Sequence, residues 1–108
     1  MNLTFNLSKE ANQATIKLSG ELDGFNRTEL SEELEKLIQE TETVSIRLEL
    51  SNLSFIDSIG LGLIAKTAKK LQLDNRKLIL LNPPAHINRL IQSSGILKFL
   101  SDSLEIQD

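Results

Sequence analysis

The sequence predicts an α/β fold with a mixed sheet of four to five strands and helices mainly on one face. Apolar residues recur at every second position in three short stretches, and at three- and four-residue steps in the longer stretches that follow them. The order strand, strand, helix, strand, helix, strand, helix implies a hairpin followed by parallel crossovers. Strands buried on both faces would be continuous apolar runs, so this alternation predicts one partly exposed face.

The first two strands are predicted at residues 3–7 and 14–18, where apolar and polar residues alternate on either side of a polar turn. Residues 19–25 are rich in turn formers and predict a loop. Asn26 and Glu29 then match the spacing of a capping box, so we expect a helix from there to about residue 39. Its buried stripe is predicted to be Leu30, Leu34, Leu37 and Ile38.

The stretch from Val44 to Leu71 changes its period at Asp57. Alternation over 44–50 predicts a half-buried strand, and the helical spacing after Asp57 predicts a helix that ends near residues 73–75. Asp57 and Ser58 therefore fall at a helix start, where side-chain oxygens cap free amide groups. The same free amides and the helix dipole favour a phosphate at this position.

The remaining elements follow in short runs. Residues 77–81 predict a compact strand, which Asn82 and two prolines stop. Pro84 is expected to open a third helix that Gly95 closes. The apolar stripe of this helix is predicted to be Ile87, Leu90 and Ile91. A helical turn over 96–100 and an edge strand over 104–106 complete the prediction.

The composition limits the class of protein. The 108 residues are 40% apolar and 25% charged and include no cysteine, which suits one domain over 1–108 without disulfides. A net charge of −3 and an aromatic fraction of 4% argue against direct nucleic-acid binding. No run approaches the roughly 18 apolar residues of a membrane span, and the first residues lack a signal-peptide pattern. We therefore expect a cytoplasmic protein without membrane insertion.

Catalytic and metal sites find little support in the sequence. A hydrolase elbow needs glycine two residues before the nucleophile, and Ile56 occupies that position before Ser58. The single histidine, His86, reads as a lone surface residue on the third helix, and the carboxylates are too dispersed for a metal site. We expect no enzyme activity, no metal and no cofactor. Asp23 and Asp57 lie in turn-like loops, where they either cap backbone amides or contact a partner.

A phosphate-binding loop is also rejected. Gly60, then four intervening residues, then Ala65-Lys66-Thr67 imitate a P-loop with alanine in place of the second glycine. Three apolar side chains would then be stranded in that loop: Leu61, Leu63 and Ile64. Gly60 and Gly62 instead serve helix packing or the approach of a partner. Packing is the simpler interpretation for Gly62, and both interpretations stay open for Gly60.

Residues 51–62, Ser-Asn-Leu-Ser-Phe-Ile-Asp-Ser-Ile-Gly-Leu-Gly, resemble the signature of the STAS domain of bacterial anti-sigma factor antagonists. The phrases Ser19-Gly20-Glu21-Leu22-Asp23 and Ser94-Gly95-Ile96-Leu97-Lys98-Phe99 are similar to two further family segments. The resemblance covers essentially the whole chain, and so implies one STAS domain over 1–108. Ile59 stands where the family often has a second serine, and Glu49 where aspartate is common.

The resemblance implies a regulatory switch. In such proteins the serine after the aspartate, here Ser58, is phosphorylated by the anti-sigma factor, which is a serine kinase, and dephosphorylated by a serine phosphatase. The kinase brings its own ATP and Mg²⁺. The expected partner-binding residues are Asp23, Asp57, Ile59, Gly60 and Leu61.

Two other functions stay open. The same fold serves as a constitutive STAS subunit of an ABC lipid-transport complex or as a stress-signalling scaffold, in which case Ser58 would carry no phosphate. An enzyme would need a general base near Ser58. The single histidine, His86, lies far along the chain, and nothing in the sequence supports such a pair, although sequence distance alone does not exclude it.

Overall fold

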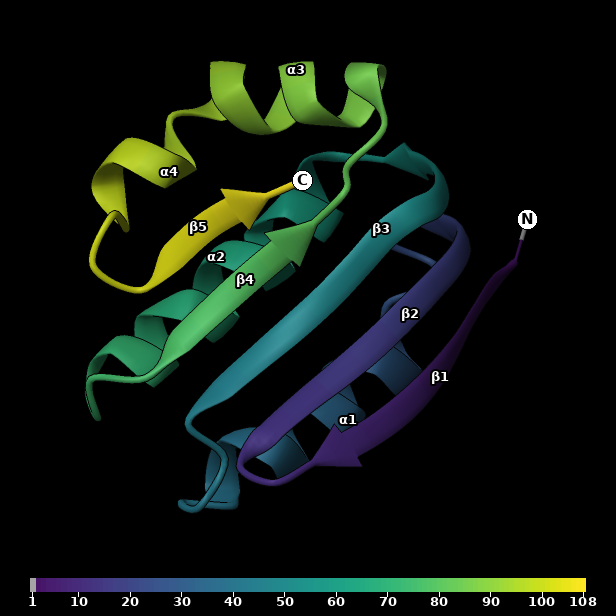
Figure 1. The fold of residues 1–108 in the computed structure, drawn as a ribbon. Coiled ribbons are helices and arrows are strands. Elements are labelled where there is room, and N and C mark those ends of the chain that lie inside the picture. Colours follow the sequence, from purple (N-terminus) through teal and green to yellow (C-terminus); the bar gives the residue numbers. More distant parts are fainter. Residues whose placement is uncertain (1) are drawn as a thin grey trace.

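A computed structural model describes residues 2–108. One sheet holds the five strands β1 (Leu3–Glu10), β2 (Gln13–Leu22), β3 (Ser45–Ile56), β4 (Lys77–Leu81) and β5 (Leu104–Gln107), in that spatial order (Figure 1). The hairpin β1–β2 is antiparallel, and every other neighbouring pair of strands is parallel. The predicted mixed sheet and its leading hairpin are confirmed.

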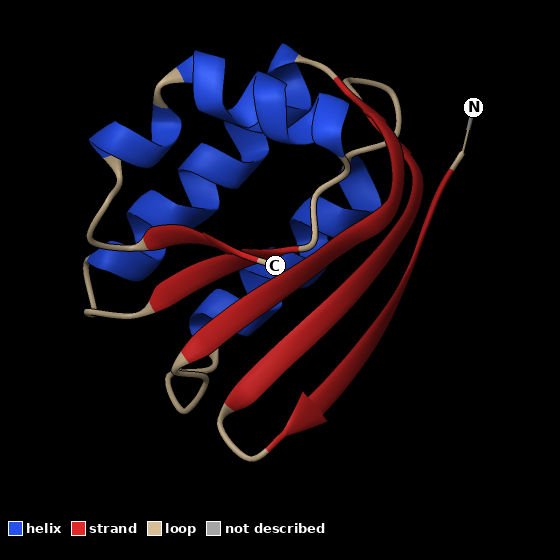
Figure 2. Cartoon of the chain, turned by 45° about the horizontal axis from the view of Figure 1, so that its top comes forward, coloured by secondary structure: helices blue, strands red, loops and turns tan. Residues whose placement is uncertain are grey.

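The helices α1 (Thr28–Gln39), α2 (Ser58–Gln72), α3 (Ala85–Ser94) and α4 (Ile96–Phe99) lie on one side of the sheet (Figure 2). The topology explains this placement. Each crossover leads to the next strand in the same direction, and parallel crossovers share one hand, so all of them pass over the same face. The longest helix, α2, has 15 residues, and no helix within 2–108 is long and apolar enough to cross a membrane.

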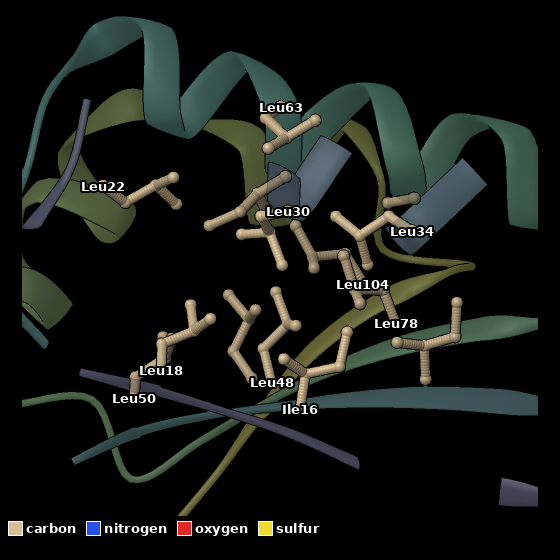
Figure 3. Packing of buried hydrophobic residues seen from close by; sticks show 14 of the residues in the cluster. Ile16, Leu18, Leu22, Leu30, Leu34, Leu48, Leu50, Leu63, Leu78 and Leu104 are labelled. Carbon is tan, nitrogen blue, oxygen red and sulfur yellow. The ribbon is translucent and has the colours of Figure 1, made fainter. Parts of the chain in front are cut away.

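The core lies between the sheet and the helices. Alternate residues of β2, β3 and β4 meet the stripes of α1 and α2 there, and Figure 3 shows this packing around Ile16, Leu48 and Leu63. On the opposite face of the sheet, Lys17 and Lys77 are exposed and Arg47 donates from Nε to Thr15 Oγ1 at 3.2 Å, whereas Ile79 of β4 is buried there. Burial on one face is what the alternating pattern predicts.

Several local predictions are wrong. β2 continues to Leu22, through half of the predicted loop, because β3 extends to Ile56 and pairs with it there. α1 begins at Thr28 with Arg27 at the N-cap position and no side-chain cap, so Asn26 lies one residue too early to cap it. Leu90 is 42% exposed rather than buried, because α3 faces the core through Ile87 and Ile91 alone.

β3 is longer than predicted because its pairing with β2 shifts register twice. The pairs are Lys17 with Glu49, Ser19 with Asn52, Gly20 with Leu53, and Glu21 with Phe55. β3 therefore carries two extra residues relative to β2, at Ser51 and Ser54, as in a β-bulge. These bulges keep three residues at a spacing of three on the core side: Leu50, Leu53 and Ile56.

Candidate functional site

The candidate site lies at the edge of the sheet where β2 and β3 end. Parallel strands end at the same edge, which is the upper edge in Figure 1, so the residues that follow them come together there. Asp23 follows β2 directly and Asp57 follows β3. The amide of Asp57 donates to the carbonyl of Leu22 at 3.3 Å, which joins the two strand ends.

Asp57 caps α2 and also holds the neighbouring loop. Its backbone is extended, and its Oδ1 accepts a hydrogen bond of 2.8 Å from the amide of Gly60, three residues on. Its Oδ2 accepts a second one, of 3.3 Å, from the amide of Gly24. Ser58 is therefore the first helical residue, and it is exposed at the amino-terminal end of the helix dipole.

Asp23 organises the turn that follows β2. Its Oδ1 accepts hydrogen bonds from the amides of Phe25 and Asn26 at 2.9 and 3.0 Å, and the residue is only 5% exposed. Both acids thus have the capping and turn-forming roles that the sequence had left open. Asp57 stays partly accessible, whereas the side chain of Asp23 is mostly enclosed.

The two glycines of α2 differ from the sequence interpretation. Gly60 is buried, and a Cβ built on it would lie 2.7 Å from the carbonyl oxygen of Leu22 and 2.8 Å from Ile56 Cγ1. Gly60 is therefore the packing glycine. Outside its own stretch of helix, a Cβ on Gly62 would meet no atom of the described residues within 4 Å, so the prediction that Gly62 serves packing is wrong. Gly62 faces outward because it lies two residues, a little over half a helical turn, from Gly60.

The apolar residues beside Ser58 are partly open. Ile59 is 50% exposed, and its Cδ1 lies over Gly24, where a Cβ would approach it to 2.8 Å. Leu61 is half-buried and packs against the core. Ile59 thus remains on the surface next to Ser58, while Leu61 presents only part of its side chain.

The first bulge of β3 is held by a carboxylate. Ser51 has no regular partner on β2, and its amide donates instead to Glu49 Oε2 at 3.1 Å. The side-chain amide of Asn82, after β4, donates to Glu49 Oε1 at 3.1 Å. Partial burial raises the pKa of Glu49, but the hydrogen bonds from Ser51 and Asn82 and the charge of Lys17 outweigh burial and lower it from 4.5.

The second bulge is held by side chains as well. Ser54 Oγ donates to the carbonyl of Gly20 at 3.0 Å. Gly20 has a φ of 105°, a backbone conformation that glycine adopts readily. His86 Nε2 donates to the carbonyl of Ser54 at 2.8 Å, since a carbonyl oxygen only accepts. His86 is exposed, as predicted, but its contact with Ser54 was missed. Sequence periodicity alone carries no signal for it.

The groups at this edge are a hydroxyl and carboxylates in defined positions. The edge offers an exposed hydroxyl at a helix start, and its neighbouring carboxylates are occupied by backbone amides. Within residues 2–108, no three or more histidine or acidic side chains gather in a way that could hold a metal ion. The nearby imidazole of His86 is engaged with a backbone carbonyl.

The model of the STAS domain matches residues 5–108. The chain belongs to the STAS domain family. Among curated relatives, an "Anti-sigma-B factor antagonist" of Staphylococcus aureus is 32% identical, over 99% of this chain and 100% of the relative. The predicted family and fold are confirmed.

Two solved STAS structures have a closely similar fold. The anti-sigma factor antagonist SpoIIAA in its unphosphorylated form aligns with a TM-score of 0.77 at 24% identity, over 97% of this chain and 88% of that one. The Bacillus cell fate determinant SpoIIAA in its phosphorylated form aligns with a TM-score of 0.75 at 26% identity, over 97% and 92%. This STAS fold therefore exists with and without a phosphate in those proteins.

Proposed function

We propose that this STAS domain is an anti-sigma factor antagonist that binds a kinase-type anti-sigma factor and is released when Ser58 is phosphorylated. The observation that carries the proposal is the position of Ser58, exposed at the first residue of α2 and directly after the capping Asp57. The names of the relatives, and the existence of SpoIIAA in two phosphorylation states, support it.

The position of Ser58 accounts for a switch that leaves the fold intact. A phosphate adds about −1.5 to −2 charges, and the positive end of the α2 dipole and its free amides tolerate them. Its hydroxyl is exposed, so the added group needs no rearrangement of the core.

Binding is the step that a phosphate opposes. Enclosing a doubly charged group against an apolar or acidic partner surface costs solvation energy, and Asp57 adds like-charge repulsion. A loss of about 3 kcal/mol at the contact lowers affinity by roughly two decades. The domain then acts as substrate and ligand in the cytoplasm, while the kinase supplies ATP and Mg²⁺ and a serine phosphatase restores the hydroxyl.

The test compares two variants of Ser58 with the organism's own anti-sigma factor, produced in recombinant form. We expect Ser58→Ala to bind with the affinity of the unmodified domain and Ser58→Asp to bind at least about tenfold more weakly. Intact-mass measurement with ATP should show one added phosphate on the wild type and none on either variant. Equal affinity of the two variants, or a phosphate on Ser58→Ala, would contradict the proposal.

A further inference from the structure

The loop between β2 and α1 displays a phenylalanine almost entirely to solvent. Phe25 is 95% exposed, a higher fraction than that of any other large apolar side chain in the described part of the chain. Exposed aromatic rings are common anchors of protein interfaces, where a pocket of the partner encloses them. A single exposed ring is not yet a site, so its surroundings decide its meaning.

Hydrogen bonds to Asp23 hold the loop that carries Phe25. The backbone amide of Phe25 donates to Asp23 Oδ1 at 2.9 Å, and the amide of Asn26 donates both to this oxygen and to the Asp23 carbonyl. Asp23 is itself 5% exposed, so the turn is fixed to the body of the domain. A partner that binds the ring therefore has little backbone to order, which lowers the entropic cost of binding.

The same loop is joined to the start of α2. Asp57 Oδ2 accepts from the amide of Gly24, and Ile59 Cδ1 rests where a Cβ of Gly24 would stand. Phe25 directly follows Gly24, and Ser58 lies between Asp57 and Ile59 in the chain. The loop that carries Phe25 and the helix start that carries Ser58 are thus in direct contact.

Phe25 also forms one wall of a groove of ≈ 230 Å³. Leu3 and Phe5 of β1 line the groove with it, and both are only half-buried. Asn2, Asn26, Thr28 and Glu29 make the rest of the lining polar. A partner that encloses the ring would cover Leu3 and Phe5 at the same time, which adds buried apolar area next to the anchor.

We propose that Phe25 is the aromatic anchor of this surface, and that it enters an apolar pocket on the kinase-type anti-sigma factor that engages Ser58. The inference rests on the proposed function and adds a residue that anchors this partner. Continuity with the Ser58 surface favours this partner over a second copy of the chain. Phe25 contributes binding energy, and it takes no part in the transfer of phosphate to Ser58.

The experiment measures the affinity of Phe25→Ala for the recombinant anti-sigma factor, with Phe99→Ala as the matched control. Phe99 is 89% exposed but lies on α4, beside the opposite edge of the sheet from β1 (Figure 1). We expect Phe25→Ala to weaken binding about 10- to 30-fold, Phe25→Leu to weaken it less, and Phe99→Ala to change it less than about twofold. All three variants should unfold at the wild-type temperature, because neither ring is packed in the core.

The kinetics of Ser58 phosphorylation distinguish a role of Phe25 in binding from a role in phosphate transfer. For Phe25→Ala, the KM of the kinase for the domain should rise while its kcat stays within about twofold of the wild-type value. The proposed role of Phe25 would be wrong if Phe25→Ala bound with wild-type affinity, or if Phe25→Ala and Phe99→Ala lost affinity equally. Sedimentation that shows a wild-type dimer converted to a monomer by Phe25→Ala would also overturn it, since the ring would then bind a second copy. If the Ser58 variants bind equally, the proposed function fails, whatever Phe25 does.

Discussion

β2 and β3 pair differently along their two halves. From Gln13 with Ser45 to Lys17 with Glu49 the strands stay in register, and every core residue follows two positions after the last. Beyond Glu49 the register shifts twice, and the amides and carbonyls at the shifts are bonded by side chains of Glu49, Ser54 and His86. The regular half of the pair contributes alternate residues to the core, and the irregular half positions the strand ends that precede the candidate site.

The difference shows how bulges in one of two parallel strands can set the position at which the following helix begins. Two extra residues in β3 advance its end relative to β2, so that the amide of Asp57 meets the carbonyl of Leu22 and α2 starts beside the Asp23 loop. Bulges are known to redirect the residues that follow them. Substitutions in the irregular half should therefore disturb the site and the stability together.

The largest effect is expected at the contact between α2 and the ends of the two strands. Gly60→Ala would place a methyl group 2.7 Å from the Leu22 carbonyl, and such overpacking costs about 1–3 kcal/mol of unfolding free energy. Gly62→Ala, the matched control, meets no described atom within 4 Å and should stabilise the domain by about 0.5–1 kcal/mol. Urea denaturation measures both. Equal changes in unfolding free energy for Gly60→Ala and Gly62→Ala would show that the irregular half tolerates displacement of α2.

A smaller effect is expected for the carboxylate that joins the helix to the loop. Asp57→Ala removes the acceptor for Gly60 and for Gly24, and loss of a helix cap costs about 1–2 kcal/mol. Amide exchange at both glycines should accelerate relative to the wild type. Asp102→Ala, in the exposed turn before β5, should change neither stability nor exchange. Unchanged exchange at Gly24 in Asp57→Ala would mean that the loop is held independently of α2.

The same division explains which predictions succeeded. The regular half and α2 follow the ordinary periods of strands and helices, so alternation over 44–50 and the change of period at Asp57 located them correctly. The sequence left open whether Asp57 caps backbone amides or contacts a partner. The structure shows that it caps α2, and that Ser58 is exposed at the first helical residue. The partner-binding roles of these residues stay predictions.

Sequence periodicity failed in the irregular half for a physical reason. A strand with a bulge breaks the period of two, so the predicted strand ended at Leu50, although Leu53 and Ile56 beyond it are buried as well. Their spacing of three was the available signal. The inward side of Gly60 and the outward side of Gly62 depend on how α2 crosses the ends of β2 and β3, which is a tertiary property that no local pattern carries.

The smallest effect concerns the junction of the two halves at Glu49. Its pKa in the folded state is below 4.5, because hydrogen bonds from Ser51 and Asn82 outweigh burial, so folding favours its charged form. A lowered folded-state pKa gives stabilisation that is present above the unfolded pKa and is lost as the pH falls through the folded one. The free energies of unfolding of the wild type and Glu49→Gln, measured by urea denaturation, should therefore differ at pH 7 by about 1 kcal/mol or less, and converge as the pH falls through the folded-state pKa of Glu49. A difference that persists at the lowest pH at which the domain folds would show that the shape of the side chain, and not its charge, stabilises the bulge.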